Sequence, residues 1–173
     1  ACDWRIASAD RATKLGLPET KLGIIPAWGG STRLPRVIGL AKALDAILGG
    51  KTFNAKKALA LGLIDDIAPR AYLIETAREY LARGKRSPKR RGHPFLSAAL
   101  AKVLRPKIQH DLQKTTRGHY PALDRALDVV LRAASMSNEE SGLALERAAI
   151  AELITLESTK NLLRLFALQE RAK

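Results

Sequence analysis

Apolar residues recur every three or four positions through most of the second half of the chain, which is the spacing of one face of an amphipathic helix. The clearest such face comprises Leu123, Ala126, Leu127, Val130, Leu131 and Ala134. The segment Ser137-Asn138-Glu139-Glu140 has the residues of a capping box and predicts the start of another helix. We expect that helix to face inward through Leu143, Ile150, Leu153 and Ile154, and a last helix to carry Leu162, Leu163 and Phe166.

Two further helices are predicted ahead of these, from Phe95 to Leu104 and from Lys107 to Thr116. We place a break between them at Pro106, because a proline inside a helix removes one hydrogen bond and crowds the preceding turn. His119 lies in the turn that follows, with no acid or cysteine at the spacing of a metal ligand. We therefore interpret His119 as a structural residue and expect no metal site.

The first half of the chain mixes a short strand pattern at Ile6 and Ala7 with further helices. Apolar spacing predicts one helix from Leu34 to Leu48, which Gly49-Gly50 should end. Asn54 is a typical N-cap for a short helix from Ala55 to Leu61. A last helix in this half is predicted from Tyr72 to Arg83, with an inward face made by Leu73, Ala77, Tyr80 and Leu81.

The stretch from Leu15 to Gly39 carries the candidate chemistry and reads LGLPETKLGIIPAWGGSTRLPRVIG. It places one carboxylate, Glu19, between a Gly-Leu-Pro turn and an apolar run that ends at Pro26. Two glycines, Gly29 and Gly30, then precede a helix start, where a ligand can approach bare backbone N–H groups at the positive end of the helix dipole. A fixed carboxylate beside such donors suits a general acid or base, although a plain surface turn can have the same residues.

The same stretch resembles the acid-bearing motif of the crotonase family, much like GLPExKLGxxPGxGGxxRLPRxxG, at nearly every fixed position. The resemblance implies that Glu19 is one of two catalytic glutamates that hold a water over the double bond of a 2-enoyl-CoA thioester. It also implies a substrate-binding role for Ala27, Trp28, Gly29 and Gly30.

Two of these positions leave questions for the structure to answer. The family often has glycine where this chain has Ala27, so a positive φ at Ala27 would strain the backbone. Trp28 is equally compatible with a wall of the acyl pocket and with a core tryptophan.

The tail extends the resemblance, because its GHYPA turn and the segments EESGLALERAAIAEL and STKNLLRLFALQERAK are similar to the linker helices of multifunctional fatty-acid oxidation α-subunits. We therefore expect an incomplete α/β crotonase-like ββα spiral followed by an all-α region. The implied domains are the C-terminal part of a hydratase domain at 1–83, a basic linker at 84–94 and a helical region at 95–173. This last region would lead to an NAD-binding dehydrogenase domain that the sequence does not contain.

The resemblance further implies that the second glutamate, the oxyanion donors and most of the coenzyme A site lie upstream of Ala1. We therefore expect the 173 residues to be an internal piece of a longer protein, without cofactor and inactive alone. The implied partners are an acyl-CoA substrate and a thiolase β-subunit, in an oligomeric parent.

Charge adds one feature to this picture. Lys and Arg number 30 against 17 Asp and Glu, and between Arg83 and Arg117 eleven bases face one acid, Asp111, a net of +10 out of +13. A solvated linker explains such a run, contact with a membrane surface or a partner comes next, and nucleic acid is disfavoured because no recognition motif accompanies the charge.

Two further observations concern the compartment. Cys2 is the single cysteine, and no apolar run reaches the roughly 18 residues of a membrane-spanning helix. We therefore expect a cytoplasmic protein.

The function that these observations predict is hydration of 2-enoyl-CoA to 3-hydroxyacyl-CoA in fatty-acid β-oxidation, in a parent that also oxidises the product with NAD. Two alternatives stay open. The Glu19 motif is compatible with another crotonase activity, such as an isomerase or an acyl-CoA hydrolase. The tail is also compatible with a non-catalytic scaffold that docks a thiolase subunit.

Overall fold

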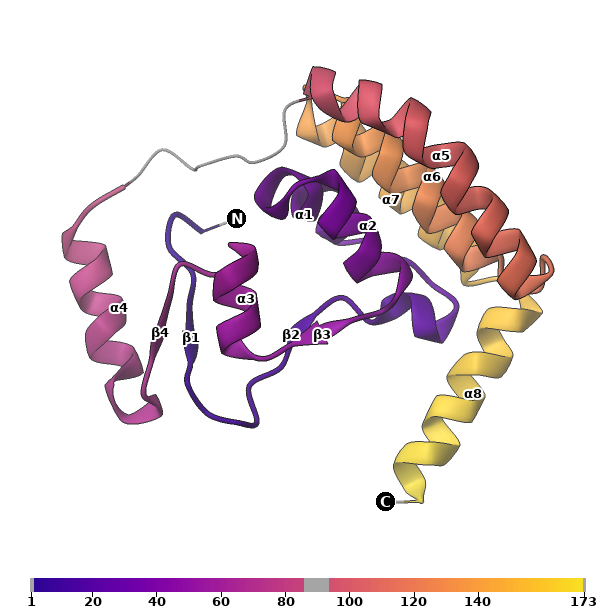
Figure 1. The fold of residues 1–173 in the computed structure, drawn as a ribbon. Helices are drawn as coiled ribbons and strands as arrows, with labels where there is room; N and C mark the ends of the chain where they lie inside the picture. The colour runs from indigo at the N-terminus through magenta and orange to yellow at the C-terminus, as the bar shows by residue number, and fades with distance from the viewer. Residues whose placement is uncertain (1, 86–93, 173) are drawn as a thin grey trace.

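A computed structural model describes residues 2–85 and 94–172, so residues 86–93 of the predicted basic linker lie outside the described residues. Helices dominate the described chain, as Figure 1 shows. Its strands and short 3₁₀ helices are β1 (Ile6–Ser8), β2 (Leu15–Gly16), η1 (Glu19–Leu22), β3 (Thr52–Phe53), β4 (Asp66–Ala68) and η2 (Arg70–Tyr72). Its α-helices are α1 (Gly30–Ile38), α2 (Leu40–Leu48), α3 (Ala55–Leu61), α4 (Leu73–Ala82), α5 (Pro94–Thr116), α6 (Pro121–Ser135), α7 (Glu139–Leu153) and α8 (Glu157–Arg171).

Helix α6 is the centre of the main core. It packs against α5 and α7, beside which it lies in Figure 1, and against α1 and α2 from the first half of the chain. Most of the face predicted from its apolar spacing is confirmed, since five of its six members are buried: Ala126, Leu127, Val130, Leu131 and Ala134. The predicted C-terminal helical region therefore shares one core with the segment that carries Gly29 and Gly30.

A smaller cluster joins the strands. β1 pairs in parallel with β4, Ala7 opposite Ile67, and β2 pairs antiparallel with β3. Helix α3 contributes Ala55 and Ala58 to the apolar contacts of this cluster. On its outer side, α4 packs on β1, and the ring of Tyr80 meets Trp4 edge-on at 5.0 Å. We refer below to β1, β4 and α4 as the outer lobe.

The helix predicted from Leu34 to Leu48 is two helices, α1 and α2, so that prediction was wrong. The break lies at Gly39, whose φ of 88° and ψ of 153° no helix accommodates. Apolar spacing did not reveal the break, because Ile38 and Leu40 on either side of it are both buried. The change of direction allows α1 and α2 each to pack against α6.

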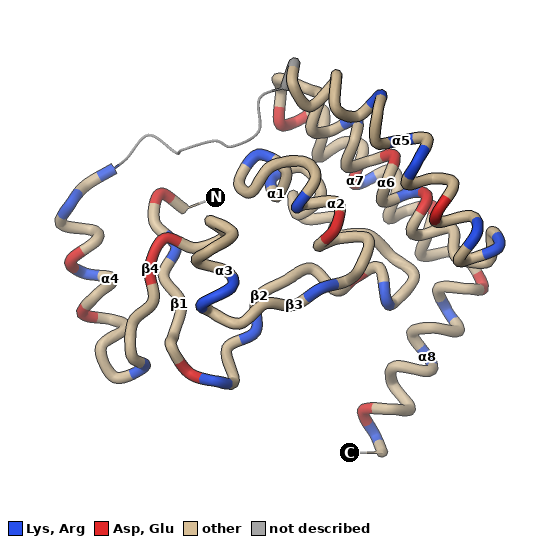
Figure 2. Tube along the Cα trace, viewed as in Figure 1, with Lys and Arg blue, Asp and Glu red and all other residues tan. Residues whose placement is uncertain are grey.

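The predicted break at Pro106 is also wrong, because α5 runs unbroken from Pro94 to Thr116. Its contacts with α6 outweigh the hydrogen bond that the proline removes, since Leu104 and Ile108, on either side of Pro106, pack against the main core. Arg105 adds an ion pair of 2.8 Å with Asp128 of α6. Figure 2 shows basic positions along much of α5, which this pair partly balances.

The N-caps agree better with prediction than the inward faces do. Asn54 caps α3 by accepting a hydrogen bond from the N–H of Lys57 at 2.9 Å, and α3 has the predicted bounds. For α7 the predicted start is right, but Asn138 is the N-cap, accepting from the N–H of Glu140, in place of the Ser137 that the capping box would use. By contrast, Leu81 of α4 is 75% exposed and Ile154 is 54% exposed, so both were wrongly assigned to the interior.

Candidate active site

Glu19 begins the one-turn helix η1, directly after Pro18. Gly23 ends the turn with a φ of 77°, and the N–H of Ile24 donates back to the carbonyl of Glu19 at 3.3 Å. The left-handed conformation at Gly23 is open to glycine and costly for other residues. The Pro-Glu…Gly spacing of the motif thus fixes where the carboxylate leaves the backbone.

Three hydrogen bonds from distant elements hold this turn. The hydroxyl of Thr20 donates to the carbonyl of Ile47 in α2 at 2.8 Å, and the hydroxyl of Tyr120 donates to the carbonyl of Lys21 at 3.1 Å. From the start of α8, the hydroxyl of Thr159 donates to the carbonyl of Gly23 at 2.8 Å. Thr20 and Thr159 are buried, so the Glu19 turn is tied firmly to the surrounding helices.

A cavity of about 700 Å³ opens beside Glu19. We call it the Glu19 cavity. Glu19 is the only carboxylate among its described lining residues, which are otherwise mostly apolar. One face of α7 forms a wall through Leu143, Arg147 and Ile150, and the opposite side includes Ala27, Trp28 and Gly30. The structure therefore brings three of the four predicted substrate-binding residues to the cavity of the predicted acid.

Burial raises the pKa of Glu19 above its ordinary value, and a hydrogen bond from its own backbone N–H offsets part of this rise. Its Oε2 atom is buried and has no hydrogen-bond partner among the described residues. An acidic group with a raised pKa keeps its proton to higher pH, because the apolar surroundings disfavour the charged form. The group therefore suits proton donation into the cavity.

Helix α1 begins beside this cavity, but its N-terminus is not bare. The N–H of Gly29 donates to Oε2 of Glu146 at 2.5 Å, and the N–H and hydroxyl of Thr32 both donate to Oε1 at 2.7 Å. The prediction that a ligand can use the Gly29 N–H is therefore wrong. Glu146 could have been noticed in the sequence, because it lies three positions after Leu143 and four before Ile150 on an inward face.

The two open questions at Ala27 and Trp28 have clear answers. Arg117 is the only described residue other than glycine with a positive φ, so Ala27 is not strained. No hydrogen bond from the N–H of Ala27 is found within the described residues, which leaves this donor for a ligand. Trp28 is 99% exposed, so the core interpretation was wrong.

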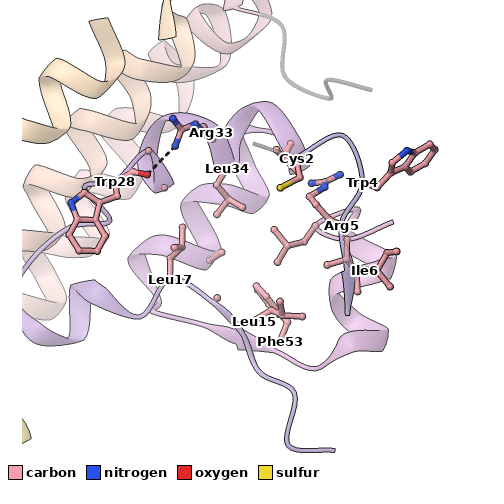
Figure 3. Close-up of a pocket in the computed structure, with 17 residues that line it drawn as sticks. Cys2, Trp4, Arg5, Ile6, Leu15, Leu17, Trp28, Arg33, Leu34 and Phe53 are labelled. Atoms are coloured by element: carbon pink, nitrogen blue, oxygen red, sulfur yellow. Dashed lines mark hydrogen bonds between the residues drawn. The ribbon is translucent and has the colours of Figure 1, made fainter. Parts of the chain in front are cut away.

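Trp28 lies between two cavities. A second apolar cavity of about 630 Å³ reaches from Trp28 toward the outer lobe, and Leu17, Trp28, Gly30 and Arg33 line both. Figure 3 shows Trp28 at one end of this cavity, Trp4 at the other, and Leu17 and Leu34 between them. A guanidinium N–H of Arg33 donates to the carbonyl of Trp28 at 3.0 Å and holds this turn in place.

Two arginines supply positive charge to the lining of the Glu19 cavity. Arg33 pairs with Glu139 at 2.8 Å, and Arg147 pairs with Glu140 at 2.9 Å, both acids lying in the first turn of α7. The Arg147–Glu140 pair is solvent-exposed and the Arg33–Glu139 pair is half-exposed, so each contributes little to stability. Both guanidinium groups thus stay near the surface, where an anionic part of a ligand can reach them.

No helix in the described ranges is both long enough and apolar enough to cross a membrane. The same residues contain no group of three His, Cys, Asp or Glu side chains placed to hold a metal ion. Cys2 is exposed and unbridged.

The chain is similar to curated proteins over nearly its whole length. It is 35% identical over 172 residues to the fatty acid oxidation complex subunit alpha of Shewanella baltica, covering 96% of this chain and 24% of that protein. The subunit alpha of Vibrio vulnificus is 36% identical over 179 residues, again with 96% and 24% covered. The chain thus spans about a quarter of the length of the curated relatives that it matches.

Solved structures confirm the predicted fold class. A carnitinyl-CoA hydratase from Mycobacterium avium aligns with a TM-score of 0.61 at 22% identity, over 96% of this chain and 52% of that one. An enoyl-CoA hydratase/isomerase from Pseudoalteromonas atlantica aligns with a TM-score of 0.60 at 18% identity, over 97% and 54%. The sequence profile of the enoyl-CoA hydratase/isomerase family matches residues 1–125. With its Glu19 motif in place and most of its length matched, the chain belongs to the enoyl-CoA hydratase/isomerase family.

Proposed function

We propose that Glu19 is a general acid–base group in the hydration of a 2-enoyl-CoA thioester. The observation that carries this proposal is the environment of its carboxyl group, which lies in an apolar cavity with a raised pKa and one buried oxygen without a partner. A surface turn residue would have an ordinary pKa and a solvated carboxylate. Family membership supports the substrate class, because the name of the family and the names of the two similar solved structures all refer to CoA thioesters.

In the proposed reaction, the oxygen of water bonds to Cβ of the double bond while a proton is added to Cα. Glu19 donates the Cα proton, and a second carboxylate takes the proton that the water loses. The N–H of Ala27 is free to hold the water or the thioester, and the apolar lining shields the charge that develops. Trp28, at the junction of the two cavities, would contact the acyl group.

The second carboxylate is not among the described residues that line the cavity. We propose that it comes from residues outside this 173-residue sequence, as do the thioester's oxyanion donors. Activity is therefore to be tested in the complete natural protein that contains these residues.

The proposal extends to the setting of the reaction. The name of the similar proteins, fatty acid oxidation complex subunit alpha, supports a role in fatty-acid oxidation within a complex. On the motif resemblance alone, we extend the proposal to a cytoplasmic location, a dehydrogenase domain that uses NAD, a thiolase β-subunit and an oligomeric assembly. The domain division at 84–94 belongs to the same proposal. The proposal also includes contact of that linker's basic residues with a membrane surface.

Replacing Glu19 with Gln in the natural protein tests the proposed role. The variant keeps the shape of the side chain and removes the transferable proton, so kcat for hydration of crotonyl-CoA should fall by roughly 10²- to 10⁴-fold. Dehydrogenase activity on a 3-hydroxyacyl-CoA should stay near that of the wild type. The matched control is Glu75→Gln, an exposed glutamate on α4.

A loss of less than about fivefold in hydration would reduce Glu19 to a turn residue. The same assays should include isomerisation of a 3-enoyl-CoA. If the wild type isomerised this substrate and did not hydrate crotonyl-CoA, the proposed reaction would be wrong while the role of Glu19 in proton transfer could stand.

A further inference from the structure

Glu146 is a fully buried carboxyl group with 0% exposure, and it lies far from the Glu19 motif of residues 15–39 in sequence. All three groups that it binds are donors, namely the N–H of Gly29 and the N–H and hydroxyl of Thr32. A carboxylate offers these donors two oxygens that accept only, and a helix N-terminus is where its negative charge is most favoured. No basic side chain pairs with it among the ion pairs of the described residues.

The packing of α7 on α1 is built to allow this contact. Gly142, one turn before Glu146, is buried against Thr32, and a Cβ atom there would lie 2.6 Å from Cγ2 and 2.9 Å from Oγ1 of Thr32. Only glycine lets the two helices approach this closely. The small residue and the buried acid therefore act together to dock α7 onto the start of α1.

Docking at this point has consequences for the Glu19 cavity. Leu143 and Arg147 flank Glu146 on α7 and line the cavity, and on the facing side Gly29 lies between two cavity residues, Trp28 and Gly30. Glu146 thus joins the two walls of the cavity without entering it, since it is not one of the lining residues. A shift of either wall would move the N–H of Ala27 relative to the Glu19 carboxyl.

We propose that Glu146 is a positioning residue of the Glu19 site, which fixes the Ala27–Gly30 backbone and the α7 wall against each other. This inference rests on the proposed hydratase function. A purely structural role would lower stability and leave the turnover of the folded enzyme unchanged. A positioning role would lower kcat, because a displacement of about 1 Å in a reacting geometry can cost on the order of 10²-fold.

The test compares Glu146→Gln, Thr32→Val and Gly142→Ala in the complete natural protein. Glutamine has one acceptor oxygen and one NH₂ group. Its NH₂ would therefore face either the N–H of Gly29 or the donors of Thr32, and two donors cannot form a hydrogen bond with each other. We expect kcat for crotonyl-CoA hydration to fall roughly 10- to 100-fold in Glu146→Gln with KM within about threefold. Gly142→Ala should lower kcat in the same way because it separates the helices, and Thr32→Val should do so less.

Two controls isolate the effect. Thr32→Ser should recover most of the activity lost in Thr32→Val, because serine keeps the hydroxyl that reaches Glu146. Glu152→Gln changes an exposed acid on the same helix and should leave kcat unchanged. If Glu146→Gln folds too poorly to assay, Thr32→Val removes a single donor and gives the same readout.

Amide hydrogen exchange is a second measurement, which does not depend on enzyme activity. In Glu146→Gln, the amides of Gly29 and Thr32 should exchange at least about tenfold faster, with the amides of α2 unchanged. Unchanged exchange, or faster exchange with kcat within about twofold of wild type, would overturn the positioning role. If the wild type does not hydrate crotonyl-CoA, the proposed function is refuted. The positioning role for that reaction is then refuted as well, whatever the exchange data show.

Discussion

The helices around α6 and the outer lobe of β1, β4 and α4 differ in how completely they cover their apolar residues. In α6, Leu127, Val130 and Leu131 are at most 2% exposed. In α4, Ile74 is 65% exposed and Leu81 is 75% exposed. The sheet of the outer lobe has only two strands of three residues each, which is too little to be stable without helix packing.

The difference shows where the site gets its rigidity. Among the described residues, the long-range hydrogen bonds that hold the Glu19 turn and the Gly29 turn involve α2, α7, α8 and Tyr120 at the start of α6, and none involves the outer lobe. Reactive groups need a support that does not open locally. The helices packed around α6 therefore serve as the frame of the candidate site. Of the two cavities that meet at Trp28, the outer lobe borders only the second.

The largest change in the free energy of unfolding is expected for a substitution at the centre of α6. Leu131→Ala removes a fully buried side chain and leaves a cavity, so the free energy of unfolding should fall by about 2–5 kcal/mol. Chemical denaturation followed by circular dichroism measures the change. A loss below about 1 kcal/mol would show that the core around α6 relaxes easily and is not the frame described above.

A smaller effect is expected where α8 meets the Glu19 turn. Thr159→Val keeps the shape and leaves the carbonyl of Gly23 buried without its hydrogen bond, which should cost about 1–3 kcal/mol. The control is Thr155→Val, an exposed threonine whose hydroxyl also bonds a carbonyl. Equal unfolding midpoints for the two variants would mean that α8 does not support the turn.

The smallest effect is expected on the outer lobe. Leu81→Ser exchanges an exposed side chain and should change the free energy of unfolding by no more than about 0.5 kcal/mol. Thermal unfolding of the natural protein measures it. A loss as large as that of Leu131→Ala would mean that another part of the protein covers α4, and that the two regions are equally buried.

The elements that the sequence predicted well have local causes. Asn54 and Gly62 bound α3 by a cap and a left-handed glycine, and both signals lie directly next to the helix in sequence. The apolar face of α6 was also predicted correctly, because the apolar residues of this buried helix recur clearly every three or four positions. The motif around Glu19 was found for the same reason, since its turn depends on Pro18 and Gly23 nearby.

What the sequence did not predict depends on partners far along the chain. Pro106 stays within α5 because Leu104 and Ile108 on either side of it pack against the main core. A rule that considers only the proline and its sequence neighbours does not include such tertiary contacts. Glu146 and Gly29 are 117 positions apart in the sequence, so the residues around either one do not indicate the hydrogen bond between them. Trp28 was ambiguous because a tryptophan beside a ligand cavity and one in a core have the same neighbours in sequence.

The pKa of Glu19 tests the central claim most directly. Its folded-state pKa is raised, so the folded state binds more protons than the unfolded state between the ordinary value of 4.5 and the raised value. The free energy of unfolding should therefore fall as pH rises through that window, and above it Glu19→Gln should be more stable than the wild type. The gain should disappear below pH 4.5.

Carbon-13 NMR of the Glu19 carboxyl in the complete natural protein gives this pKa without an activity assay. The expected result is a titration midpoint clearly above 4.5. A midpoint for Glu19 at or below 4.5 would mean a solvated or ion-paired carboxylate, and it would contradict the role of Glu19 as a proton donor in an apolar cavity.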